Sequence, residues 1–60
     1  MCSYTNIEIN GNKYREDYKN NTYYLYDRYN KTIAIIADNK CLFIGGNKTD
    51  AEKWFNSLGF

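Results

Sequence analysis

The side chains that could support catalysis are few, and their spacing does not suit it. The chain has no histidine and two cysteines, Cys2 and Cys41, so a cysteine nucleophile would lack its usual general base. The adjacent carboxylates Glu16 and Asp17 would point to opposite faces of a strand rather than toward a shared proton. No group of these residues has the spacing of a zinc site. The sequence therefore predicts a protein that is not an enzyme and that uses no cofactor or metal.

The two cysteines are not expected to form a structural disulfide. Cys2 lies in a terminus that is expected to fray, and nothing in the sequence fixes its distance from Cys41. Cys41 stands at the start of a predicted strand, where a cysteine is most often a small, buried apolar residue. We therefore expect Cys41 to be buried.

Tyrosine is the most conspicuous residue type, with seven copies among 60 residues. In one interpretation the rings cover a thin core while their hydroxyls stay in water. In a second they form an interaction surface, because Tyr and Arg are over-represented among interface hot spots. In a third the rings stack on nucleic-acid bases, with phosphates held by Arg15, Lys19, Arg28 and Lys31. The candidate partner-binding residues are Tyr24, Tyr26, Arg28, Tyr29 and Phe43.

Length and charge limit the classes to which the chain can belong. Residues 1–60 are enough for one small domain with a marginal core. The net charge is +1 and the charges are interspersed, which is weak evidence against a dedicated nucleic-acid binder. The N-terminus shows no secretory signal and no apolar run approaches a membrane span, so we expect a cytoplasmic protein.

A β-hairpin is predicted over residues 4–17. Its centre is the dipeptide Asn10-Gly11, the strongest short signal for a type I′ turn, in which both central residues need positive φ. This turn sets residues of complementary type opposite one another, namely Glu8 with Lys13 and Ile7 with Tyr14. The polar residues 18–21 that follow show no periodicity, and we expect them to form a connecting loop.

A three-stranded antiparallel meander is predicted over residues 22–45. Residues 22–27 are rich in aromatic and β-branched types. Residues 32–37 are apolar on both would-be faces, so this strand should be central. If residues 30–31 and 38–40 are the loops, the pairs are Tyr26 with Ile35, Leu25 with Ile36, Arg28 with Ile33, Ile36 with Leu42, and Ile35 with Phe43.

These registers would give the sheet two different faces. The aliphatic face would carry Tyr23, Leu25, Ala34, Ile36, Leu42 and Ile44. The aromatic face would carry Tyr24, Tyr26, Arg28, Ile33, Ile35, Cys41 and Phe43. We expect the aliphatic face to seat a helix, and the aromatic face to be covered by the N-terminal hairpin, by a second copy of the chain or by a foreign partner.

A C-terminal helix is predicted over residues 50–58. Thr49 and Glu52 have the spacing of a capping box, and Asp50 lies favourably at the positive end of the helix dipole. One apolar stripe is formed by Ala51, Trp54, Phe55 and Leu58. Gly59 is placed to end the helix in a left-handed conformation, with Phe60 folding back onto Phe55. So short a helix must pack its stripe on the sheet.

The fold class is therefore predicted to be α+β: a small antiparallel meander with an N-terminal hairpin and one C-terminal helix on one face of the sheet. We expect a non-enzymatic protein-binding function. Asn, Lys, Ile and Tyr make up 28 of the 60 residues, and their A/T-rich codons indicate an AT-rich genome. A short chain that starts at Met and carries no chemistry fits an accessory factor of a phage or other mobile element, which would inhibit a host or immunity complex as anti-CRISPR proteins do.

Two alternatives stay open at this point. One is a small DNA- or RNA-binding regulator that uses the Tyr/Arg face, by analogy with small DNA-binding domains built from a three-stranded sheet and a helix. The other is a self-associating structural subunit, in which two copies meet through Tyr24 and Tyr26 as a homodimer.

Overall fold

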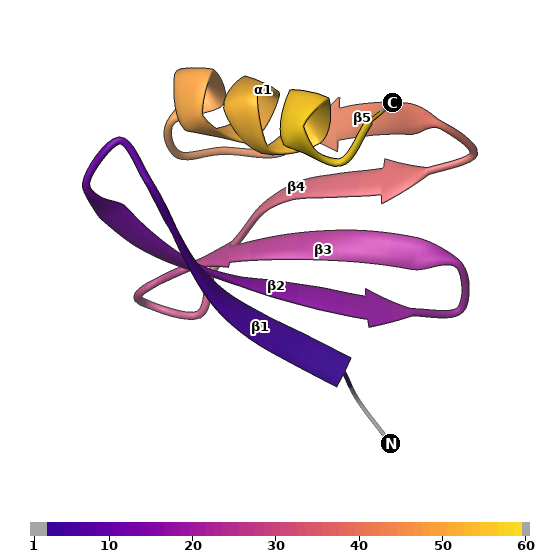
Figure 1. The fold of residues 1–60 in the computed structure, drawn as a ribbon, viewed down its shortest axis with the longest axis horizontal. Helices are drawn as coiled ribbons and strands as arrows, with labels where there is room; N and C mark the ends of the chain where they lie inside the picture. Colours follow the sequence, from indigo (N-terminus) through magenta and orange to yellow (C-terminus); the bar gives the residue numbers. More distant parts are fainter. Residues whose placement is uncertain (1–2, 60) are drawn as a thin grey trace.

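The structure is a computed structural model that describes residues 3–59, and it is an α+β fold with one antiparallel sheet and one helix. The strands run in chain order across the sheet, β1-β2-β3-β4-β5. The C-terminal helix packs on one face of this sheet (Figure 1). The bounds are β1 Ser3–Ile9, β2 Asn12–Lys19, β3 Thr22–Asp27, β4 Thr32–Ala37, β5 Lys40–Phe43 and α1 Lys48–Ser57. Within the described residues, no helix is long and apolar enough to span a membrane.

Three of the hairpin turns are two-residue loops whose residues tolerate positive φ. The loops are Asn10-Gly11, Asn20-Asn21 and Asp38-Asn39, with φ between 52° and 83° at all six positions. Both central residues of a type I′ turn need such values, and Asn, Asp and Gly reach them at the lowest cost. The predicted hairpin is confirmed, because Glu8 lies opposite Lys13 and Ile7 lies opposite Tyr14.

The prediction of a loop over residues 18–21 is wrong. Tyr18 and Lys19 continue β2, and Asn20-Asn21 alone reverses the chain into β3. Strand β2 therefore pairs with β3 over the whole length of β3, from Tyr14 opposite Asp27 to Lys19 opposite Thr22. The N-terminal hairpin extends the sheet to five strands and does not fold across its face (Figure 1).

The predicted register between β3 and β4 is also wrong, because the connection spans residues 28–31 rather than Asn30-Lys31 alone, and a β-bulge then interrupts the pairing. Leu25 lies opposite Ala34 and Tyr26 opposite Thr32, which leaves Ile33 as an extra residue in β4. A bulge places two consecutive residues against one partner and bends the strand. Ile33 and Ala34 are consequently both buried in the core, so Ile33 does not lie on the aromatic face as predicted.

The register between β4 and β5 differs from the prediction by one residue. The loop is Asp38-Asn39 rather than residues 38–40, so the observed pairs are Ile35 with Leu42, Ile36 with Cys41 and Ala34 with Phe43. A one-residue shift exchanges the faces of a strand. Leu42 therefore points away from the helix, while Cys41 and Phe43 lie on the helix side. Cys41 is exposed, contrary to the prediction, because β5 is an edge strand.

The N-cap of the helix lies two residues earlier than predicted. Asn47 is the N-cap, and its side chain accepts a hydrogen bond from the Asp50 amide at 3.2 Å, so the capping box at Thr49 is wrong. The apolar stripe is confirmed: Ala51 and Trp54 are buried, and Phe55 and Leu58 pack against the core. Gly59 follows the helix with φ +86°, as predicted. Phe60 lies outside the described residues.

The core lies between α1 and the face of the sheet that it covers. Its buried apolar residues are Tyr14, Leu25, Ile33, Ala34, Ile36, Ala51 and Trp54. Trp54 is 1% exposed, and its indole N–H donates to Glu16 Oε1 at 2.6 Å. The helix is thereby fixed both by apolar burial and by a directional bond to β2.

Candidate functional site

The face of the sheet turned away from α1 is the principal candidate site, and we call it the open face. Successive side chains of a strand point to opposite faces, so the residues next in sequence to the buried ones lie on the open face. Its central side chains are Tyr24, Tyr26, Ile35 and Leu42, flanked by Arg15 and Lys19. In the described part of the chain, the only helix lies on the opposite face. The aromatic centre of this sheet face is therefore left without a cover.

Tyr24 and Tyr26 form a stacked pair at the centre of the open face. Their ring centroids lie 6.3 Å apart at an interplanar angle of 16°. A cation from β2 sits over each ring: the Arg15 guanidinium lies 4.7 Å from the Tyr26 centroid, and Lys19 Nζ lies 5.2 Å from that of Tyr24. Contacts of this kind contribute about 0.5–1 kcal/mol at exposed sites, so the cations and rings hold one another in place.

An ion pair fixes the guanidinium further. Arg15 Nε lies 3.3 Å from Asp17 Oδ1, and both atoms are shielded from solvent. Asp17 stands on the open face, while its neighbour Glu16 accepts from Trp54 on the helix side. The two adjacent carboxylates thus point to opposite faces, as the sequence predicts, and each has a structural partner.

The open face also carries most of the positive charge of the sheet. Four basic residues and two acidic ones lie on it, a net charge of +2 against +1 for the whole chain. The basic residues are Lys13, Arg15, Lys19 and Lys40, and the acidic ones are Glu8 and Asp17. The interspersed charges of the sequence are therefore unequally divided between the two sides of the fold.

A buried carboxylate ties the β1–β2 turn to the helix. Asp50 is 1% exposed and accepts from the Tyr14 hydroxyl, from Asn10 Nδ2 at 2.8 Å and from Asn12 Nδ2 at 2.9 Å. Lys53 Nζ donates to Asn10 Oδ1 at 2.8 Å. The Tyr14 hydrogen bond is the largest cause that lowers the Asp50 pKa. Burial, followed by this bond, raises the pKa of Tyr14 to about 12.

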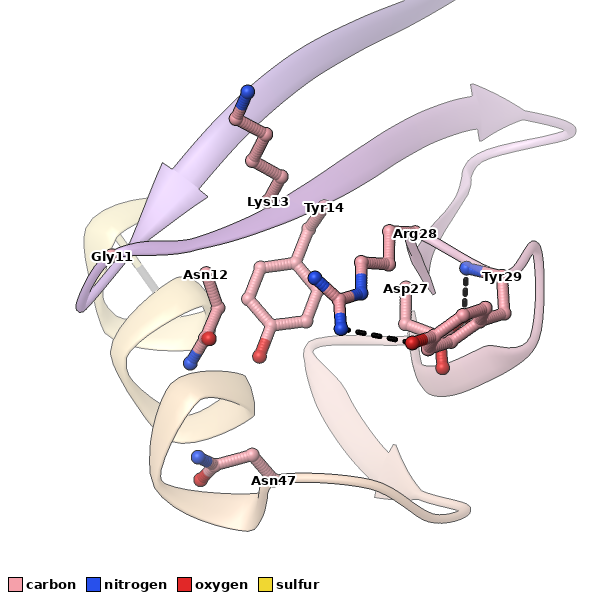
Figure 2. Close-up of a pocket in the computed structure, with 8 residues that line it drawn as sticks. All are labelled: Gly11, Asn12, Lys13, Tyr14, Asp27, Arg28, Tyr29 and Asn47. Atoms are coloured by element: carbon pink, nitrogen blue, oxygen red, sulfur yellow. Dashed lines mark hydrogen bonds between the residues drawn. The ribbon is translucent and has the colours of Figure 1, made fainter.

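Arg28 and Tyr29 do not lie on the open face. They belong to the β3–β4 connection and line a pocket of about 490 Å³ together with Tyr14, Asp27 and Asn47 (Figure 2). The Arg28 guanidinium donates to the Tyr29 hydroxyl at 2.8 Å and lies 5.0 Å from the ring centroid. Two of the five predicted partner-binding residues therefore form a separate, local pair.

The carboxylate of this pocket has a structural role. Asp27 Oδ1 accepts from the amide of Tyr29 at 2.8 Å and from that of Lys31 at 3.0 Å. Such a side-chain bond to the backbone shapes a turn. Asp27 closes the β3–β4 connection, in which Asn30 has φ 63°, and both of its Oδ1 bonds are to the protein's own backbone.

Of the five predicted binding residues, the structure brings Tyr24 and Tyr26 together and separates the others from them. Phe43 lies on the helix side of β5, opposite Ala34, and is 38% exposed. Sequence reasoning placed Ile35 on the correct face. The predicted register placed Leu42 on the opposite face. The predicted loop over residues 18–21 left β2 unpaired with β3, so Arg15 and Lys19 were not expected beside Tyr26 and Tyr24.

Comparisons with known proteins give no further information on this site: no family model, no curated protein and no solved structure matches the chain. Among residues 3–59, no three His, Cys, Asp or Glu side chains gather in a way that could hold a metal ion.

Proposed function

We propose that this chain is a non-enzymatic protein-binding module that uses the open face to occupy a surface of another protein. The observation that carries the proposal is the stacked pair Tyr24 and Tyr26 with a cation held over each ring, on a sheet face that α1 leaves bare. Aromatic residues and Arg are enriched at interface cores. The proposed role in the cell is the one that the composition suggests, an accessory factor that inhibits a host or immunity complex.

The arrangement of the cations supports a protein partner. Arg15 is held by the Tyr26 ring and by Asp17, so little side-chain freedom remains to be lost on binding, which favours affinity. A partner would meet apolar surface at Ile35 and Leu42 and positive charge at Arg15 and Lys19. We therefore expect the partner surface to combine an apolar centre with acidic residues on one side.

One observation favours nucleic acid as a second candidate, namely the net charge of +2 on the open face. Against it, base stacking on Tyr24 or Tyr26 would require Lys19 or Arg15 to leave the ring that each now covers. Salt dependence separates the two. With up to four phosphate contacts, the logarithm of the affinity would fall against the logarithm of salt with a slope of about −3.6, whereas an aromatic protein interface changes little.

The test is a pull-down from lysate of the source organism with tagged protein, with and without nuclease, using matched variants. The double variant Tyr24→Ala/Tyr26→Ala removes the aromatic pair. Tyr29→Ala is the control, because Tyr29 is 67% exposed but lies outside the open face. We expect a nuclease-resistant protein that the wild type and the control retain and that the double variant loses.

The affinity for the recovered partner, measured for wild type and variants, then gives the contribution of each tyrosine to binding. A hot-spot tyrosine contributes about 2 kcal/mol, so each single Tyr→Ala change should weaken binding about 30-fold. Retention of the partner by the double variant would show that the open face is not the binding surface. A partner lost on nuclease treatment would replace the protein-binding proposal by the nucleic-acid one.

A further inference from the structure

The outer edge of β5 differs from the opposite edge of the sheet. In β5 and the residue after it, Leu42, Phe43 and Ile44 are 62%, 38% and 52% exposed. The outer edge of β1 instead belongs to a strand whose exposed residues are mostly polar, among them Thr5 and Glu8, with Tyr4 as its exposed aromatic residue at 62%. Natural edge strands are usually protected by charges, prolines or bulges, because their unpaired backbone N–H and C=O groups can hydrogen-bond to a strand of another chain. Strand β5 has one charged residue, Lys40, and it lies at the start of the strand.

The backbone of β5 presents its free groups in a defined order. The amide of Ile44 donates to Ile33 O at 2.9 Å, and so faces β4. Since the direction of these groups alternates along a strand, Leu42 also faces β4, while the amides and carbonyls of Cys41 and Phe43 point outward. Within residues 3–59, no strand pairs with this side of β5.

The side chains of the open face also end abruptly at this edge. A cross-strand row runs from Tyr24 on β3 to Ile35 on β4 and Leu42 on β5. Such neighbours stabilise one another across a sheet. Leu42 has Ile35 on one side only, so the next place in the row would suit an apolar residue of a further strand.

We propose that the edge of β5 pairs with the same edge of a second copy of this chain, antiparallel and about a twofold axis at Leu42. This register sets Leu42 against its own copy and Cys41 against Phe43 of the other chain, so the outward backbone groups of both residues are paired. It sets Lys40 against Ile44, so the two lysines lie at opposite ends and no like charges meet. The result is a continuous ten-stranded sheet that joins the two open faces on one side. This inference goes beyond the proposed function and does not depend on it.

The first test measures mass against concentration by sedimentation under reducing conditions. We expect the wild type to shift from one 7.1 kDa chain toward two as the concentration rises to about 1 mM. Leu42→Lys and Leu42→Glu should each stay monomeric, because the twofold axis places like charges side by side, and an equimolar mixture of the two should associate. Leu42 is 62% exposed, so both variants should fold, which circular dichroism checks. A wild type that remains monomeric, or a dimer that persists in Leu42→Lys, would overturn the proposal.

The second test fixes the register. In a Cys2→Ser/Cys41→Ser background, Leu42→Cys places two thiols at Cα positions about 4.5 Å apart, within the range of a disulfide. The matched control, Lys40→Cys, places its two thiols four residues apart, about 13 Å along the strand. With oxidised glutathione as oxidant, we expect at least tenfold more covalent dimer from Leu42→Cys. Equal yields from the two variants would refute the pairing at Leu42.

Discussion

The substitution Tyr14→Phe tests the contact that fastens the first hairpin to the helix. It removes one oxygen atom and keeps the buried ring, so the core packing of a residue that is 8% exposed is preserved. The hydroxyl donates to Asp50, whose carboxylate keeps its bonds to Asn10 and Asn12 at 2.8 and 2.9 Å. The change thus isolates one hydrogen bond to a buried charge.

The expected cost follows from that geometry. A hydrogen bond to a charged group contributes about 1.5–3 kcal/mol, and the two remaining amides keep the carboxylate partly satisfied. We therefore expect a loss of about 2 kcal/mol in the free energy of unfolding. A domain this small gains roughly 3–5 kcal/mol from its core, so the variant should lose a large fraction of its stability and melt about 8–16 °C lower.

The loss in free energy of unfolding caused by Tyr14→Phe should depend on pH, and the pKa shifts of Asp50 and Tyr14 determine how. The folded pKa of Asp50 is lowered, so its stabilising effect is present above the unfolded value near 4 and is lost as the pH falls through the folded value. The folded pKa of Tyr14 is raised to about 12, so its contribution is lost as the pH rises from about 10 toward 12. The difference between wild type and Tyr14→Phe should be full at pH 7 and narrow at both extremes.

Urea unfolding followed by Trp54 fluorescence measures this difference, because Trp54 is the single tryptophan and is 1% exposed. Tyr18→Phe is the matched control, because Tyr18 lies on the same strand. Its hydroxyl donates a solvent-exposed hydrogen bond to Asn21 Oδ1 at 3.2 Å, so the change should lower the free energy of unfolding by less than about 0.5 kcal/mol. A cost for Tyr14→Phe no larger than that of the control, or one that does not decrease at any acidic pH at which the protein still folds, would refute the role assigned to Asp50.

Two further pairs of variants test the strand-to-helix connection by the same unfolding assay. Gly46→Ala should lower the free energy of unfolding by about 1–2 kcal/mol, because Gly46 has φ +78° and a Cβ would lie 2.9 Å from Ile33 Cγ2. Gly45→Ala is its control and should be near neutral, because a Cβ at Gly45 meets nothing within 4 Å. Equal costs for the two variants would contradict this account. Asn47→Ala should lower the free energy of unfolding by about 1 kcal/mol, because Asn47 is the N-cap. Thr49→Ala should cost less than half of that. The reverse order would show that Thr49 and not Asn47 caps the helix.

Local sequence signals predicted the elements well because each element depends on neighbouring residues. Asn10-Gly11 fixed the register of the first hairpin, and the stripe around Trp54 predicted the buried face of the helix. Asn20-Asn21 could have been predicted as well, since Asn is the residue after Gly that best tolerates positive φ. The helix start was ambiguous between Asn47 and Thr49, because both are good N-cap types.

The remaining features depend on contacts that no local pattern contains. Asp50 meets Tyr14, Asn10 and Asn12 across 36 to 40 residues of sequence, and at the sequence level it resembled an ordinary acidic residue in a first helical turn. The bulge at Ile33 interrupts the pairing of β3 with β4 between Leu25 and Tyr26. Neither arrangement follows from periodicity, because each requires the sheet to be formed first.

One residue of loop length determines which surfaces of this protein are available to a partner. With the three-residue loop that the sequence suggested, Leu42 would lie beneath the helix and Phe43 beside the tyrosines. The observed two-residue loop at Asp38-Asn39 exchanges them, because the side-chain period of a strand is two. The exchange continues the row from Tyr24 through Ile35 to the edge of β5. The open face and the edge proposed for self-association are therefore joined at Leu42, and substitutions there are expected to report on both surfaces, whereas Tyr26, on the middle strand, reports on the open face alone.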